Sequence, residues 1–174
     1  TAVQKLYANA KLYAGDFDNA EFADRIATLP LAEQPATRWN YSHSTDVLGR
    51  VVEVASGQTL FQFEKQRLFD PLGMSDTAYY VADKAKWPRI AQGFPVDQFR
   101  VAGIRDPTAP RRWQSGGAGL VSTIGDYARF LQMLANGGRL DGKRYLSPRT
   151  LAYMTSDHMG DVVKRGPYDL MGPG

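Results

Sequence analysis

The amino-acid sequence predicts a mainly α-helical protein with one small β-hairpin. In most segments the apolar residues recur at the spacing of a helix face, and only the stretch around Asp141-Gly142 has the pattern of a turn between two short strands. A chain of 174 residues, of which 43% are hydrophobic, is long and apolar enough for about one folded domain. The predicted strands are too few to build a sheet of their own.

Residues 1–73 are expected to form a helical part. The predicted helices cover residues 3–13, 19–29, 44–56 and 60–69. Asp18 or Asn19 is expected to cap the second helix and Thr59 the fourth, because their side-chain oxygens can accept from free backbone N–H groups. Gly57 is a good C-terminal stop for the third. The Asp-Pro-Leu-Gly sequence at residues 70–73 is expected to break the fourth.

The second half of the chain divides into three expected segments. Residues 74–118 contain four prolines and little periodicity, so we predict a long irregular segment with short strands or turns. Residues 119–160 are predicted to be helix, hairpin and helix, with Ser122 or Thr123 capping the first helix and Ser147-Pro148 opening the last. Residues 161–174 resemble a truncated tail, and we expect that the sequence is cut at both ends.

Composition argues against several classes of function. The formal charge is +3, and the 21 basic residues are scattered rather than gathered beside aromatic ones, so we expect no nucleic-acid partner. No apolar run approaches the length of a membrane span. There is no cysteine for disulfide or thiol chemistry. The sequence implies no cofactor.

Tyr41 and His43 are the candidate catalytic residues. Tyr41 lies just before a predicted helix start, where a phenol can project into a cleft and transfer a proton. A phenol has an ordinary pKa near 10, so it needs nearby cations to act as a base. His43 is a candidate for binding substrate or for holding Tyr41. The alternatives are that Tyr41 packs at the helix start and that His43 is a cap or a surface residue.

Two other stretches have a functional and a structural interpretation. Asp157, His158 and Asp161 lie close together, but a metal site needs three or four converging ligands, so a turn is the better interpretation and no metal is implied. The glycine-rich run at residues 115–119 precedes a predicted helix, where phosphate can bind. It lacks the lysine of a nucleotide-binding loop, which favours a close backbone approach beside a cleft, or a plain turn.

Four stretches, in the correct order, resemble the serine β-lactamase-like hydrolases, a family that includes class C β-lactamases, penicillin-binding DD-peptidases and related esterases. They are residues 35–42 (P-G-x-x-[WF]-x-Y-S), the helix at 47–58, residues 68–77 ([IL]-F-x-P-L-G-M-x-D-T) and residues 116–126 (G-G-x-G-L-x-S-T-x-x-D). The resemblance covers roughly residues 30–160. It implies an antiparallel sheet flanked by helices, of which this chain is the helical region and a flanking part, with the central sheet largely missing. The faces that pack on that sheet would then be exposed and able to self-associate.

The resemblance also implies a mechanism. The family uses S-x-x-K, Y-x-N and a third motif such as K-T-G or H-x-G; the serine forms an acyl-enzyme that water hydrolyses, and the tyrosine transfers protons. Tyr41 falls on that tyrosine. His43 replaces the asparagine, which weakens a β-lactamase or peptidase function more than an esterase function. We expect S-x-x-K upstream of Thr1 and the third motif beyond Gly174, so that His158-Met159-Gly160 is a false match to it.

The sequence therefore predicts part of a serine hydrolase that acts on a small acyl substrate, as an esterase or with broad acyl specificity. The chain alone is expected to be inactive, because no nucleophile is present in it. The alternative is a non-catalytic helical module that binds a partner through residues 74–118.

Overall fold

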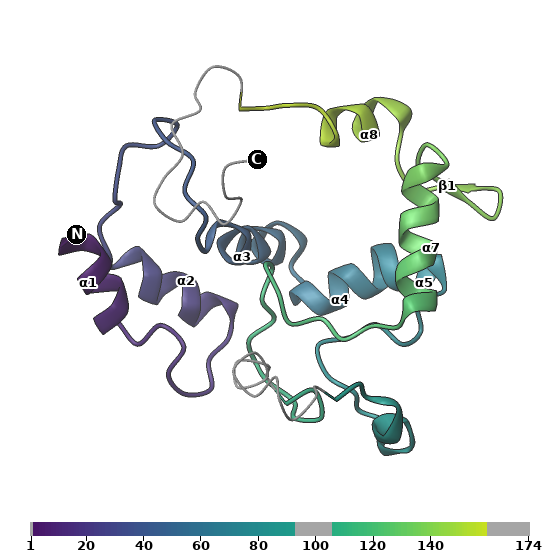
Figure 1. The fold of residues 1–174 in the computed structure, drawn as a ribbon, viewed down its shortest axis with the longest axis horizontal. Coiled ribbons are helices and arrows are strands. Elements are labelled where there is room, and N and C mark those ends of the chain that lie inside the picture. Colours follow the sequence, from purple (N-terminus) through teal and green to yellow (C-terminus); the bar gives the residue numbers. More distant parts are fainter. Residues whose placement is uncertain (1, 93–105, 160–174) are drawn as a thin grey trace.

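The computed structural model describes residues 2–92 and 106–159. Its helices in chain order are α1 (Ala2–Asn9), α2 (Asn19–Ala27), α3 (Ser44–Ser56), α4 (Leu60–Glu64), the π-helical turn η1 (Lys65–Phe69), α5 (Asp70–Leu72), the 3-10 helix η2 (Lys84–Arg89), α7 (Ile124–Ala135) and α8 (Pro148–Met154). Strands β1 (Arg139–Leu140) and β2 (Lys143–Arg144) form a hairpin. In Figure 1, α3 lies at the centre, α1 and α2 on one side of it, and α4, α5 and α7 on the other. The predicted fold class, mainly helical with one small hairpin, is confirmed.

Side chains at the helix starts supply the predicted caps. Asp18, rather than Asn19, caps α2, and Thr59 caps α4; each forms a capping box with the residue three positions later. Thr123, rather than Ser122, caps α7, and Ser147 caps α8 with Pro148 in its first turn. Local sequence therefore determines where these four helices begin.

The fourth helix ends within residues 70–73 as predicted, but three residues later than the expected end at residue 69. The helix continues from α4 through η1 into α5 and ends only at Gly73, whose φ of 69° is left-handed. In η1 the N–H of Asp70 donates to the carbonyl of Lys65, five residues back. This wider turn lets the chain pass the missing N–H of Pro71 while remaining helical.

The prediction for the first helix is too long. Helix α1 ends at Asn9, and Lys11 has a left-handed φ of 48°. This turn changes the direction of the chain, so that Leu12 is buried while Tyr13, predicted on the helix face, is half exposed. The hairpin turn fits its prediction, since Asp141 and Gly142 both have positive φ, as a type I′ turn requires.

Two apolar cores hold the described parts together. One is formed by the end of the α4–α5 helix, α7 and β1, and its buried residues are Phe69, Leu72, Met74, Met133 and Leu140. The other joins the N-terminal segment to the loop before the glycine run, and its buried residues are Leu12, Phe17, Phe22 and Trp113. The groove described below lies beside this second core.

Two of the recognised motifs form a single structural unit. The buried carboxylate of Asp126, in the first turn of α7, accepts from the backbone N–H of Asp76 at 2.7 Å and from the hydroxyl of Thr77 at 2.9 Å. Thr77 also bonds Ser122 at 2.8 Å, and Ala78 pairs with Val121 in a single β-bridge. The chain that leaves the α4–α5 helix is therefore fastened to the start of α7.

The apolar side of α3 has no partner among the described residues. Leu48, Val51 and Val54 are more than half exposed, whereas the buried positions of this helix are Asp46 and Gly49. Ile124 at the start of α7 is 92% exposed. Exposed apolar faces of this size usually pack against another element.

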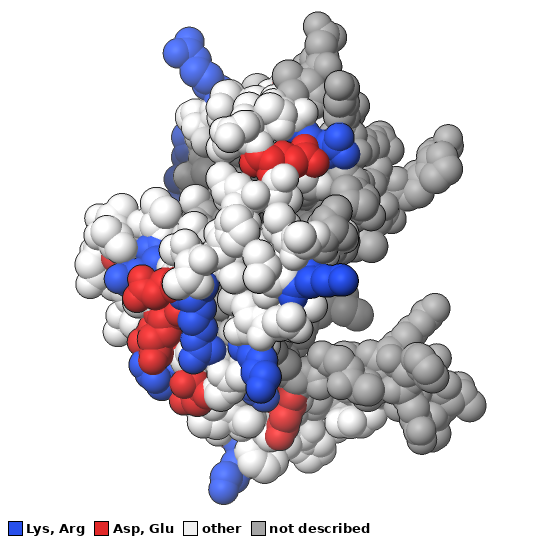
Figure 2. Space-filling view, turned by 90° about the vertical axis from the view of Figure 1, so that its left-hand side faces the viewer, with Lys and Arg blue, Asp and Glu red and all other residues white. Residues whose placement is uncertain are grey.

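The charged surface is mixed. Figure 2, which views the molecule from the side of α1 and α2, shows Lys and Arg intermingled with Asp and Glu. Arg112 pairs with Asp18 at 2.7 Å and with Glu21 at 2.9 Å. Of the helices that the structure describes, none combines the length and apolar character needed to cross a bilayer.

Candidate active site

A groove with a volume of about 2010 Å³ lies between the N-terminal helices, the start of α3 and the glycine run. Its wall is largely apolar and aromatic and includes Tyr7, Tyr13 and Trp113. Tyr41 and His43 both line it, as do Ser115 and Gly117–Val121 of the second half of the chain. The fold thus brings residues separated by about 70 positions to one concave surface, the usual form of a small-molecule site.

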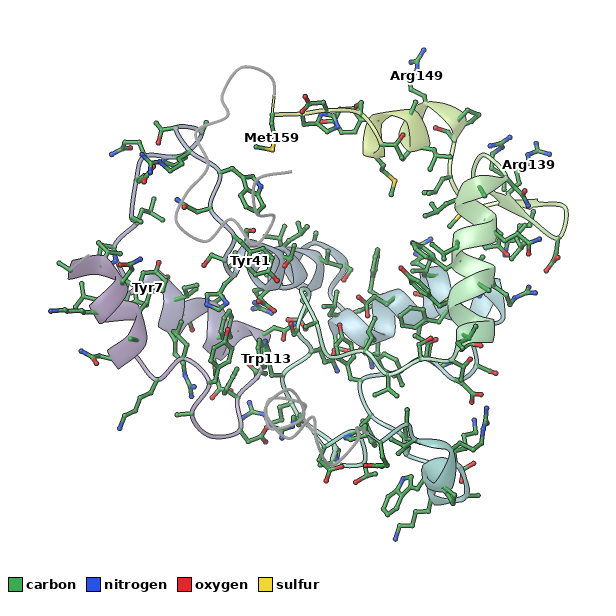
Figure 3. All side chains as sticks on the ribbon, viewed as in Figure 1. Tyr7, Tyr41, Trp113, Arg139, Arg149 and Met159 are labelled. Atoms are coloured by element: carbon green, nitrogen blue, oxygen red, sulfur yellow. The ribbon has the colours of Figure 1, made fainter. Side chains whose placement is uncertain are left out.

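Tyr41 is on the wall of this groove and is 57% exposed. It stands just before the start of α3 (Figure 3), and its ring lies 6.4 Å from that of Trp39. Among the described residues its hydroxyl has no hydrogen-bond partner. The phenol is neither enclosed in a core nor distant from a groove, so it can exchange a proton with a bound molecule.

The ring nitrogens of His43 face Tyr13 and Asp46. Its Nδ1 lies 3.0 Å from the hydroxyl of Tyr13 and 3.7 Å from Oδ2 of Asp46. Its ring meets those of Tyr13 and Phe22 edge-on, at 5.6 Å between centroids. It is the N-cap residue of α3, but its side chain makes no capping bond. This geometry favours a structural role for His43, whose imidazole connects α3 to the N-terminal segment.

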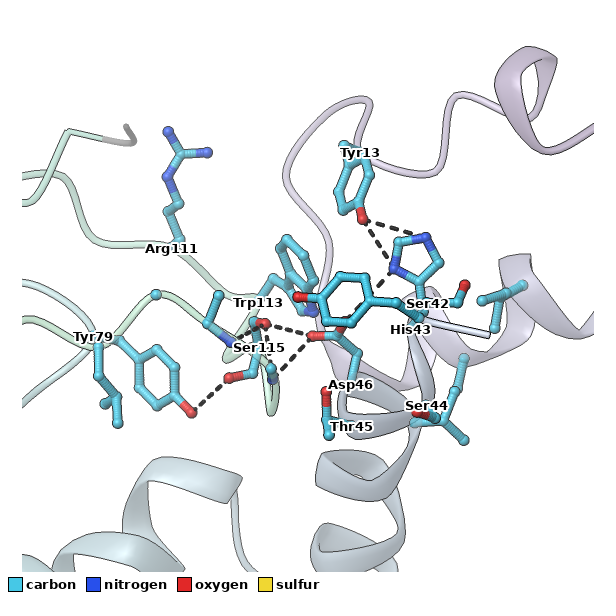
Figure 4. Close-up of a pocket in the computed structure, with 18 of the residues that line it drawn as sticks. Tyr13, Ser42, His43, Ser44, Thr45, Asp46, Tyr79, Arg111, Trp113 and Ser115 are labelled. Atoms are coloured by element: carbon cyan, nitrogen blue, oxygen red, sulfur yellow. Dashed lines mark hydrogen bonds and ion pairs between the residues drawn. The ribbon is translucent and has the colours of Figure 1, made fainter. Parts of the chain in front are cut away.

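Asp46 is a polar groove residue that the sequence did not indicate, and Ser115 was indicated only as part of the run at residues 115–119. Both are buried, and the Ser115 hydroxyl donates to Oδ1 of Asp46 in a short hydrogen bond (Figure 4). The same Ser115 oxygen accepts from the backbone N–H groups of Gly117 at 3.2 Å and Ala118 at 3.0 Å. The two residues are 69 positions apart, so no local pattern pairs them.

The glycines of residues 115–119 allow a close approach to α3. A Cβ at Gly116 would lie 2.2 Å from the backbone oxygen of Thr45, and one at Gly117 would lie 2.6 Å from the Thr45 hydroxyl. Neither position has room for a side chain. This agrees with the prediction of a close backbone approach beside a cleft.

A half-buried carboxyl, Glu64, and a half-buried phenol, Tyr79, interact beside the glycine run. The Tyr79 hydroxyl donates to the carbonyl oxygen of Ser115 at 3.0 Å. Burial raises the pKa of Glu64 to about 7. Burial, together with the nearby charge of Glu64, also raises the pKa of Tyr79, so this phenol stays protonated as a donor.

The stretch around His158 lies elsewhere. Its Nε2 is 3.2 Å from the Ser156 hydroxyl, and its ring packs on Tyr153 at the end of α8, away from the groove. Gly160 and Asp161 are outside the described residues. Within residues 2–92 and 106–159, no group of three or more acidic, histidine or cysteine side chains is placed to hold a metal ion.

Comparison with known proteins places the chain in a family. Residues 4–171 match the Beta-lactamase family, and the chain belongs to it. Protein Rv1367c of Mycobacterium tuberculosis (strain ATCC 25618 / H37Rv) is 40% identical over 145 residues, which cover 80% of this chain and 36% of that protein. Lovastatin esterase of Penicillium rubens is 33% identical over 150 residues, covering 82% of this chain and 36% of the esterase.

A solved structure shares the fold. The structure described as "EstCE1, a hydrolase with promiscuous acyltransferase activity" superimposes with a TM-score of 0.64 at 24% identity, over 80% of this chain and 40% of the other. The chain thus spans a little over a third of the length of the curated relatives that it matches.

Proposed function

We propose that the whole protein is a serine hydrolase that transfers acyl groups through a serine acyl-enzyme, and that its substrates are esters. The observation that carries this proposal is the position of Tyr41. In a chain of the Beta-lactamase family, the tyrosine that resembles the first residue of Y-x-N is exposed on the wall of an apolar groove. In this proposal Tyr41 transfers the proton between the nucleophile and the leaving group.

An ester substrate is favoured by what stands at position 43. An asparagine there would offer an amide to the amide of a peptide or β-lactam side chain. His43 instead directs its ring nitrogens to Tyr13 and Asp46, which leaves no equivalent amide contact from this position. The similarity to lovastatin esterase supports the same choice.

The nucleophile must come from an S-x-x-K sequence, and the 174 residues contain none. We therefore expect these residues alone to form no acyl-enzyme. The lysine of that motif is the cation that we expect to stabilise the phenolate of Tyr41.

A fluorophosphonate probe tests the class of function. The full-length protein should be labelled, and replacing the serine of its S-x-x-K motif with alanine should abolish labelling. If the full-length protein is not labelled, the chain is better interpreted as a binding module.

Two chromogenic substrates test the substrate class. We expect a p-nitrophenyl ester to be hydrolysed with a kcat/KM at least about tenfold above that for a chromogenic cephalosporin, a difference of about 1.4 kcal/mol in transition-state stabilisation. The reverse order would favour a β-lactamase.

A further inference from the structure

The two carboxylate oxygens of Asp46 contact different parts of the groove wall. It lies in the first turn of α3, five positions after Tyr41, and is 8% exposed. On one side Oδ1 accepts the Ser115 hydroxyl and lies 3.4 Å from the backbone nitrogen of Gly117. On the other side Oδ2 faces Nδ1 of His43 at 3.7 Å (Figure 4).

The bonds continue beyond these neighbours. His43 meets the Tyr13 hydroxyl at 3.0 Å, and the carbonyl of Ser115 accepts from Tyr79 at 3.0 Å. A continuous chain of polar contacts therefore connects Tyr13, His43, Asp46, Ser115 and Tyr79. All five residues line the groove and come from four separate parts of the chain.

Burying a carboxylate costs several kcal/mol unless its oxygens are bonded. Asp46 bonds Oδ1 to Ser115 and Gly117 and places Oδ2 3.7 Å from Nδ1 of His43, so the contacts that offset this cost also fix the groove wall. If Asp46 were lost, the glycine run would lose its side-chain bonds to α3, and His43 would lose the carboxylate that faces its Nδ1. Misplacing a reacting group by about 1 Å can reduce a rate by about 10²-fold.

We propose that Asp46 is a positioning residue for acyl transfer. It holds the glycine run at residues 115–119 and His43 against the start of α3, so that the groove wall and Tyr41 keep a fixed separation. This inference rests on the proposed hydrolase function.

Asp126 is a matched control. It is also 8% exposed and also accepts a backbone N–H and a hydroxyl, from Asp76 and Thr77. Unlike Asp46, it does not line the groove. If a buried carboxylate matters only for folding, Asp46→Asn and Asp126→Asn should behave alike.

The test measures fluorophosphonate labelling of the full-length protein. The final labelled fraction reports how many sites are folded. The labelling rate constant reports how well the reacting groups are positioned. We expect Asp46→Ala to lower the rate constant at least tenfold at an unchanged final fraction. Asp46→Asn should fall between Asp46→Ala and the wild type, since an amide oxygen can still accept from Ser115. Ser115→Ala should also slow labelling, whereas Asp126→Asn should leave the rate constant within about twofold.

Three outcomes would overturn the proposal: wild-type rate constants in Asp46→Ala and Ser115→Ala, an equal slowing in Asp126→Asn, or a loss confined to the final labelled fraction. Absence of labelling in the wild-type protein would instead contradict the hydrolase function itself, so the two failures are distinguishable. Should Asp46→Ala not fold, Ser115→Ala and Asp46→Asn still decide the question.

Discussion

Glu64 is a carboxyl group beside Tyr79 whose pKa burial raises from 4.5 to about 7. Its Oε2 is buried and has no hydrogen-bond partner among the described residues. A carboxyl whose pKa is higher in the folded state binds its proton more tightly there than in the unfolded chain. Its contribution to stability is therefore complete below pH 4.5 and is lost as the pH rises through about 7.

Glu64→Gln tests this pH dependence. Glutamine keeps the shape and carries no charge at any pH, so above pH 7 the variant should have a larger free energy of unfolding than the wild type. The difference should be about 1 kcal/mol, a discounted value because the side chain is only partly buried. Denaturant unfolding at pH 5 and pH 8 provides the measurement. A wild-type minus variant difference that does not change between these pH values would contradict the account.

The glycine run packs directly against the start of α3. Gly116 approaches Thr45 so closely that a methyl group would overlap a backbone oxygen, which cannot move as a side chain does. Gly125, in α7, has no atom closer than 3.9 Å to the position of a Cβ. We therefore expect replacement by alanine to have opposite effects on stability at these two glycines.

Gly116→Ala should lower the free energy of unfolding by about 1–3 kcal/mol, the usual cost of overpacking. Gly125→Ala should leave stability unchanged or raise it by up to about 1 kcal/mol, because alanine favours a helix. Thermal or denaturant unfolding of the two variants is the comparison. Equal stability of the two would show that the glycine run does not pack on α3 as described.

The sequence predicted the elements better than it predicted their contacts. Caps such as Asp18 and Thr59, the stop at Gly57 and the Asp141-Gly142 turn depend on residues within four positions of each other, and all four predictions are confirmed. The helix expected to stop at residue 69 continues to Leu72, because a π-helical turn accommodates Pro71.

For the candidate site, local sequence indicated Tyr41 and His43, and both line the groove. It did not indicate Asp46 or the bond between Asp46 and Ser115, because this bond joins residues 69 positions apart and depends on the tertiary fold. Local patterns also could not predict the orientation of His43 toward Tyr13, since it follows from the turn at Lys11.

At the scale of the molecule, the main feature is the set of apolar side chains without a partner among the described residues. Leu48, Val51 and Val54 form such a set on α3, and Ile124 projects from the start of α7. The family resemblance implies a central sheet, and we expect these faces to pack on it. They explain why the apolar periodicity of α3 is strong although its apolar side is exposed.

Val51→Lys tests the role of this surface in two settings. In the 174-residue chain the charge should reduce self-association, measured by sedimentation, because it interrupts the apolar surface. In the full-length protein the same charge should be buried against the sheet and should lower the free energy of unfolding by at least about 2 kcal/mol. Gln66→Lys, at an exposed position of η1, should have neither effect. An unchanged stability of the full-length Val51→Lys protein would show that α3 does not face the sheet.

Acylation of the full-length protein by a p-nitrophenyl ester in a single turnover shows whether the phenol of Tyr41 transfers the proton. We predict that Tyr41→Phe lowers the acylation rate constant by about 10²–10⁴-fold, the usual contribution of a general acid–base group. Tyr153→Phe, which changes an exposed tyrosine outside the groove, should leave it unchanged. Acylation of Tyr41→Phe at the wild-type rate would contradict the account.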